Sequence, residues 1–195
     1  MSNTRLEIAN GALLKLGVKQ LTSLDSLEPY ASDVRQSLDR VGNLVLASHG
    51  WACASKRISI APISARIGAT TNINEAKRTK FRLPDDLVRI VKIEDKNSDS
   101  LYEWRKLIGE IEVYGEHANI KLTYVSTKAL DDVIPSSLIT AISYRLAYEL
   151  CELITGSTSE RASLLNEYER ALSQAWLEDQ QQNATDQAIA SNWLA

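Results

Sequence analysis

The chain has 195 residues and a mass of 21.7 kDa, enough for one domain or for a core with an inserted subdomain. Hydrophobic residues make up 44% and charged residues 24%, an ordinary globular composition, and a net charge of −3 predicts no general attraction to nucleic acid or anionic membranes. Contact with a polyanion is therefore expected to be local. No stretch reaches the ~18 apolar residues that a membrane span needs, so no membrane partner is expected.

Two helices are expected in the first fifty residues. Apolar side chains recur at helical spacing from Thr4 to Leu16, and Gly17 ends the pattern. Pro29 suits the first turn of a second helix, which is expected to run to about Ser48. Trp51 follows that helix, and its indole is expected to pack as an anchor in the core.

The apolar period changes from 3.6 to 2 between Lys56 and Thr127, which predicts half-buried antiparallel strands. The alternating apolar residues are Ile58, Ile60, Val91, Ile93, Ile111, Val113, Ile120, Leu122 and Tyr124. Gly109 and the segment from Gly115 to Asn119 supply turns. The polar stretch from Ser64 to Thr79 is expected to be a long surface loop.

A helical hairpin is expected near the end of the chain. The helical period returns from Ser136 to Thr155, and Gly156 stands where a helix end favours a left-handed residue. Ser157 and Glu160 form a capping box for the last helix, which is expected to end near Asp179.

These patterns predict an α+β fold. Residues 1–50 and 135–179 are expected to form a helical core, residues 55–128 an inserted antiparallel β-sheet subdomain, and residues 180–195 an extended C-terminal tail. The tail is polar until Trp193 and Leu194, a pair that either docks on its own subunit or inserts into another, unless the end is disordered.

Motifs for catalysis or cofactor binding are missing from the sequence, so we expect neither an enzyme nor a cofactor. The two cysteines are expected to be buried thiols. The alternative is a metal site in which the pair His49 and Cys53 is completed by Cys151 and His117, although His117 is expected to be a solvated turn residue. The paired carboxylates at 85–86 and at 131–132 adjoin turns, where Asp is favoured for capping.

One segment concentrates basic residues: Lys77, Arg78, Lys80 and Arg82. With Phe81 as its lone aromatic residue, it is expected to be a solvated or protein-facing edge, and contact with a DNA backbone is the alternative. Together with Trp193 and Leu194 it is the candidate assembly interface.

Several short segments, in their order and spacing, carry a resemblance to a known family. They are Leu16-Gly17, Ser23-Leu24, Trp51, Phe81 to Arg89, Ile120 to Val125, Pro135, Leu146-Ala147, Ile154 to Ser157 and Tyr168 to Leu172 with Ala175 and Asp179. In this order the chain resembles the tail tubular protein A family, the head-to-tail adaptors or gatekeepers of short-tailed bacteriophages.

The resemblance implies a non-enzymatic virion protein, made in the host cytoplasm, that forms a dodecameric ring between the portal and the tail nozzle. Genomic DNA would pass through this ring without sequence-specific binding. Two other classes stay open: a DNA-binding protein that uses the Lys77 to Arg82 segment, and an α+β protein that binds a small ligand. Salt-dependent DNA binding by the isolated protein would favour the first of these.

Overall fold

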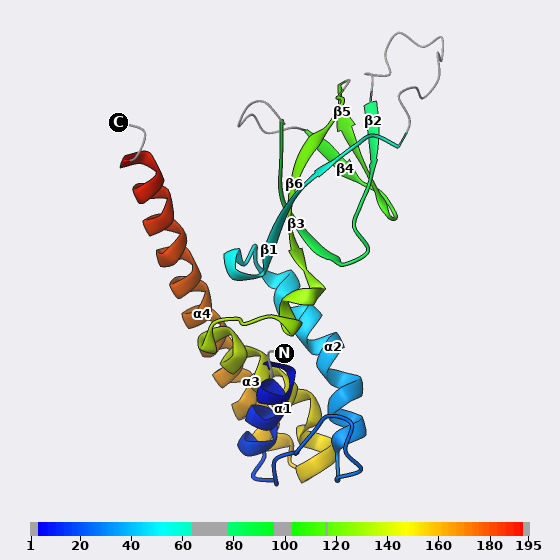
Figure 1. The fold of residues 1–195 in the computed structure, drawn as a ribbon. Coiled ribbons are helices and arrows are strands. Elements are labelled where there is room, and N and C mark those ends of the chain that lie inside the picture. The colour runs from blue at the N-terminus through cyan, green and yellow to red at the C-terminus, as the bar shows by residue number, and fades with distance from the viewer. Residues whose placement is uncertain (1–3, 64–77, 96–102, 116, 193–195) are drawn as a thin grey trace. The chain divides into compact units, whose positions relative to one another are not determined.

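The computed structural model describes residues 4–63, 78–95, 103–115 and 117–192, with side chains described as far as Gln182. These residues form four α-helices and two three-stranded antiparallel sheets, which confirms the α+β class (Figure 1). The chain divides into a helical unit, residues 1–54 and 127–195, and a strand unit, residues 55–126. In the described part of the chain, no helix has both the length and the apolar character of a membrane-spanning segment.

The first helix, α1 (Thr4–Lys15), ends as its sequence predicts. Gly17 has a positive φ of 70°, and its N–H donates to the Leu14 carbonyl at 3.1 Å. The next N–H, of Val18, reaches back to Leu13 at 3.1 Å. These two bonds form a Schellman motif, which satisfies carbonyls that the end of the helix would otherwise leave unpaired.

The second helix, α2 (Ala31–Ser48), begins after Pro29, which belongs to the preceding turn. Tyr30 at the helix start adopts the left-handed conformation, with φ of 65°. Beyond the helix Trp51 is buried, and its indole N–H donates to the Val45 carbonyl at 3.1 Å. The expectation of a core anchor is therefore confirmed.

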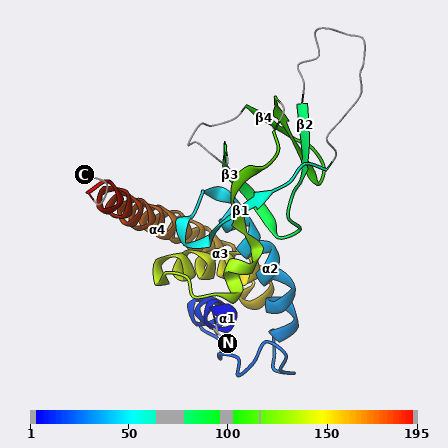
Figure 2. The ribbon, with the colours of Figure 1, turned by 45° about the horizontal axis from the view of Figure 1, so that its top comes forward.

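Helices α3 (Ser136–Thr155) and α4 (Thr158–Asn192) form the expected hairpin and lie side by side (Figure 2). Gly156 has φ of 67°, and the Ser157 hydroxyl accepts the Glu160 N–H at 3.2 Å. The Ser157 N–H donates to the Thr155 hydroxyl at 3.1 Å. The turn is thus closed by the Ser157 half of the capping box together with Thr155.

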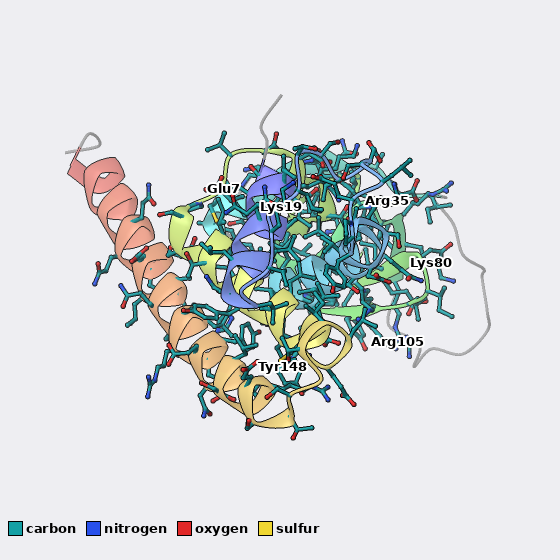
Figure 3. The ribbon with its side chains drawn as sticks, turned by 90° about the horizontal axis from the view of Figure 1, so that it is seen from below. Glu7, Lys19, Arg35, Lys80, Arg105 and Tyr148 are labelled. Carbon is teal, nitrogen blue, oxygen red and sulfur yellow. The ribbon has the colours of Figure 1, made fainter. Side chains whose placement is uncertain are left out.

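A stack of cationic and aromatic side chains supports this hairpin. The guanidinium groups of Arg145 and Arg161 lie 4.8 and 4.7 Å from the ring of Tyr148, which is labelled in Figure 3. Arg145 also pairs with Glu149 at 2.8 Å, one helical turn away. The stack joins both helices of the hairpin close to their connection, because Arg161 belongs to α4 and the other residues to α3.

The C-terminal tail is helical for most of its length, contrary to expectation. α4 continues to Asn192 where the sequence analysis ends it near Asp179. The continuation is rich in Gln and Ala, which have high helix propensity, whereas the expectation rested on its lack of apolar periodicity. Trp193 and Leu194 lie outside the described residues.

The strand unit contains two sheets. Their strands are β1 (Ser55–Ile60), β2 (Arg78–Arg82), β3 (Leu87–Asp95), β4 (Trp104–Lys106), β5 (Glu110–Tyr114) and β6 (Ile120–Ser126). One sheet has the order β1-β6-β3 and the other β2-β5-β4. The two sheets share one core, made of Phe81, Leu83, Ile93, Ile111, Val113, Ile120, Leu122 and Tyr124. Because side chains alternate along a strand, the opposite faces of both sheets carry polar side chains.

Two of these strands are absent from the sequence-based expectation. β2 begins at Arg78, inside the stretch predicted to be a loop, and residues 64–77 of that stretch lie outside the described residues. Thr79 and Phe81 are buried between exposed or half-buried basic neighbours, which is the period of a strand. β4 has only three residues, too few for alternation to be recognised.

Candidate functional site

Two hollows on the helical unit, beside Trp51 and along α4, lack the features of a ligand cavity. A hollow of about 50 Å³ beside Trp51 and Asp179 is far below the several hundred cubic ångströms of a small-molecule site. A larger hollow along α4 is an open groove lined by polar residues and Leu177. Neither hollow gathers the buried polar groups that orient a substrate.

The hypothetical metal site is not formed. Among the described residues, no group of three or more His, Cys, Asp or Glu side chains is placed to hold a metal ion. The ring of His49 lies against Trp51 and Trp176, with centroid distances of 5.2 and 5.5 Å. His117 belongs to the strand unit, where it is half-buried and its Nε2 lies 2.7 Å from the Tyr114 carbonyl. His117 therefore lies in the expected loop, where it is partly rather than fully exposed.

The two cysteines have different environments. Cys151 is buried in α3, as expected, whereas Cys53 is an exposed residue. The Cys53 thiol nevertheless lies against Asp179, and partial burial together with this carboxylate raises the pKa of Cys53 to about 12. A thiol with so high a pKa is a poor nucleophile near neutral pH, so Cys53 is not an activated thiol.

The aspartate pairs are structural, in keeping with their places beside turns. Asp86 accepts hydrogen bonds from Ser126 at 2.7 Å, from Tyr124 at 3.0 Å and from Lys56 at 3.2 Å. Burial opposes ionisation of this carboxyl, but the three donors outweigh it and lower the pKa of Asp86 to about 2. Asp131 pairs with Arg5 at 2.6 Å in the helical unit.

The predicted basic segment forms the outer face of the β2-β5-β4 sheet. Arg78 and Lys80 both contact Glu112, at 3.5 and 3.7 Å, and Arg105 of β4 contacts it at 2.9 Å. Figure 3 labels Lys80 and Arg105. The Glu112 side chain is 11% exposed, so one buried carboxylate holds three cations and offsets part of their charge.

Arg82 ends β2 and is exposed, and among the described residues it forms no ion pair. Glu110 lies opposite Arg82 in the sheet register, which adds a second acidic group to this face. Lys77, Trp193 and Leu194 lie outside the described residues, so of the candidate interface residues only Arg78, Lys80 and Arg82 are placed.

The β1-β6-β3 sheet carries a more basic outer face. Glu94 of β3 has a side chain only 6% exposed, and it contacts Lys92 at 2.6 Å and Arg57 of β1 at 3.7 Å. Lys121 of β6 lies opposite Glu94 in the register, and Arg89 lies opposite Val125. Among the described residues, four cationic side chains thus share this face with the Glu94 carboxylate, and the sequence does not gather them into one basic segment.

The register of the strands explains why the basic residues of this face cannot be recognised as a group in the sequence. Its basic residues come from three strands and are separated by more than sixty positions, so no local run reveals them. The available signal was the alternation itself, because the polar positions of each strand are the ones that share the outer face.

Charge is divided unequally between the two units. Residues 55–126 contain 13 Lys and Arg against 10 Asp and Glu, whereas the rest of the chain contains 9 against 15. The net charge of −3 therefore combines +3 on the strand unit with −6 on the helical unit. The weak acidity of the whole chain conceals a basic strand unit.

No family model matches the chain, and a search of curated proteins found no match.

Proposed function

We propose that this protein is a structural head-to-tail adaptor of a short-tailed phage, a subunit of a ring that joins the portal to the tail nozzle around the DNA channel. The proposal gives it no catalytic role. It places the protein in the virion tail, after synthesis in the host cytoplasm, with genomic DNA, the portal and the nozzle as partners.

One observation carries the proposal: the segments that bear the family resemblance coincide with structural junctions. Leu16-Gly17 is the Schellman end of α1, Trp51 is the buried anchor after α2, and the turn at Gly156-Ser157 joins α3 to α4. Between them, the segment from Phe81 to Arg89 contains Asp86, which joins β1 and β6 through three hydrogen bonds. Junction residues determine the order and connection of elements, so similarity at these points favours a similar architecture.

The surface supports a structural role over a small-molecule role. The described hollows are small or open, and no metal-binding cluster occurs among the described residues. A ring subunit instead needs two unlike surfaces, because each copy contacts its neighbours heterologously. A basic strand unit and an acidic helical unit in one chain meet that need.

Electron microscopy with mass measurement tests the proposal directly. The purified protein is imaged alone, with portal rings, and with portal and nozzle proteins together. We expect closed rings of uniform subunit number seated on the portal. A protein that remains monomeric and does not bind portal rings under all three conditions would contradict the adaptor role.

A further inference from the structure

The outer face of the β1-β6-β3 sheet presents an excess of positive charge around one buried carboxylate. From Arg57, Lys92, Lys121 and Glu94 on this face, we infer that it binds the phosphate backbone of double-stranded DNA without sequence preference, and that Glu94 weakens this binding as an internal competitor. The inference does not depend on the adaptor proposal, because duplex binding is measurable whether or not the protein assembles.

The arrangement of side chains around the central strand, β6, supports contact with the phosphate backbone of DNA. Thr123 of β6 lies between Arg57 on one side and Lys92 on the other in the sheet register. Its hydroxyl oxygen is buried and has no hydrogen-bond partner among the described residues. Arg and Lys side chains are common donors to phosphate oxygens, so this row places two such groups about 10 Å apart on either side of Thr123, whose buried hydroxyl is not accessible to a phosphate.

Lys121 lies two residues before Thr123 on β6, on the same face of the sheet. It is half-buried, and within the described residues it forms no ion pair, although Glu94 is its neighbour in the register. Glu94 instead engages Lys92 and Arg57. Lys121 therefore has no direct carboxylate partner among the described residues.

The composition of the face favours a duplex over an acidic protein or a single strand. Cores of protein interfaces are depleted in charge and rely on aromatic or aliphatic anchors. Single strands bind on aromatic side chains against which bases stack. Here the outward positions of β1 are Ser55, Arg57 and Ser59, and Tyr124 of β6 is turned to the opposite side, where it meets Asp86. Charge and hydroxyl groups without stacking rings suit a phosphate backbone.

Glu94 has a defined part in this arrangement. A carboxylate held between Lys92 and Arg57 occupies the donors that a phosphate would otherwise engage. Phosphate contact then requires those side chains to exchange an internal anion for an external one, which reduces the affinity. Three cations, Arg57, Lys92 and Lys121, and one carboxylate leave about two net contacts, which predicts a roughly 12-fold loss of affinity between about 50 and 200 mM salt.

The experiment measures binding of the full-length protein to a fluorescent duplex of mixed sequence, by anisotropy over a series of salt concentrations. Lys121→Gln and Arg57→Gln should each weaken binding and reduce the salt slope by about 0.9. Glu94→Gln, which keeps the shape of the side chain, should strengthen binding and steepen the slope by a similar amount. Arg82→Gln is the matched control, since it removes one exposed charge from the other sheet, and it should leave binding nearly unchanged.

Several results would overturn the inference. If Arg82→Gln weakens DNA binding as much as Lys121→Gln, the DNA is attracted by the net charge of the strand unit and not by this face. If Glu94→Gln folds, by circular dichroism, without tighter binding, the competitor role is wrong. Tighter binding of polyglutamate or of a single strand than of the duplex would assign the face to another partner. Should Glu94→Gln fail to fold, Lys121→Glu must lower the slope by about 1.8, and an unchanged slope excludes this face.

Discussion

The carboxylate of Asp179 binds the backbone N–H of Ala52 with both oxygens, at 3.0 and 3.1 Å, across 127 positions of sequence. The N–H of Cys53 approaches the same carboxylate at 3.4 Å. Asp179 is buried on α4, and the two donors open the short 3₁₀ turn η1 (Ala52–Ala54), which directly follows Trp51. One side chain thus ties the middle of the last helix to the end of the N-terminal helical segment, within the helical unit.

Replacing Asp179 should destabilise the helical unit. Asp179→Ala leaves the N–H groups of Ala52 and Cys53 without their acceptor, which is expected to cost about 1–3 kcal/mol. Asp179→Asn keeps one carbonyl acceptor and should cost less. Urea unfolding followed by tryptophan fluorescence measures both, with the exposed Gln180→Ala as control. A midpoint for Asp179→Ala no lower than that for Gln180→Ala would contradict the capping role.

The same carboxylate should control the chemistry of Cys53. Partial burial and Asp179 raise the pKa of the Cys53 thiol to about 12, so very little thiolate exists at pH 8. Asp179→Asn removes the neighbouring negative charge and should lower that pKa, with about tenfold more thiolate for each unit. Iodoacetamide labelling with mass mapping of peptides distinguishes Cys53 from Cys151. Equal labelling rates of Cys53 in the variant and the wild type would show that the charge has no effect.

Acid should weaken the strand unit through Asp86. The folded-state pKa of about 2 lies below the usual 3.8, so ionised Asp86 stabilises the fold above pH 4. That contribution is lost as the pH falls from about 4 to about 2. The difference in urea midpoint between the wild type and Asp86→Asn should therefore be large at pH 7 and should shrink towards pH 2. Asp85→Asn, at the exposed neighbouring position, is the control, and a difference that does not change with pH would contradict the prediction.

Local signals predict the helices of this chain well and its charged faces poorly. The bounds expected for α3, Ser136 to Thr155, are the observed ones, because Pro135 and Gly156 mark both ends. α4 extends beyond its expected end near Asp179 to Asn192, because the continuation has high helix propensity but no apolar periodicity. Apolar periodicity reports burial against a core, so it underestimates a helix that continues as a polar segment.

In the strand unit, sequence patterns fail to predict strand β2 and the more basic face. The stretch from Arg78 to Arg82 alternates basic residues with Thr79 and Phe81, which is the period of a strand, but its high charge is equally typical of a surface loop. Arg57, Lys92 and Lys121 meet only through strand register, a long-range property that no window of sequence contains. The basic segment found in the sequence is the one more strongly offset, by Glu112, and the more basic face was missed.

The hairpin turn provides a local test of stability. The Ser157 hydroxyl accepts the Glu160 N–H, so Ser157→Ala should cost about 1 kcal/mol. Glu160→Ala should cost less, because the Ser157 N–H donates to Thr155 and the side chain of Glu160 is not needed to satisfy it. Denaturant midpoints compare the two variants with Ser163→Ala, at an exposed position of the same helix. A larger loss for Glu160→Ala than for Ser157→Ala would restore the full capping box and contradict the observed geometry.

The last prediction concerns assembly and rests on the proposed adaptor function. α4 continues for 13 residues beyond Asp179 to Asn192, which corresponds to about 20 Å of helix, and the sequence then ends in Trp193-Leu194-Ala195. Burial of a Trp-Leu pair in a neighbouring molecule would contribute several kcal/mol, at about 25 cal/mol per Å². In a ring this contact would recur at every subunit. Removal of residues 192–195 should therefore leave the melting temperature of the free subunit nearly unchanged while lowering the yield of rings or of ring–portal complexes severalfold. Trp176→Ala is the matched control, since it removes a described, 41% exposed tryptophan from the same helix. A truncation that lowers the melting temperature, with assembly reduced only in proportion, would place the pair in the subunit's own core.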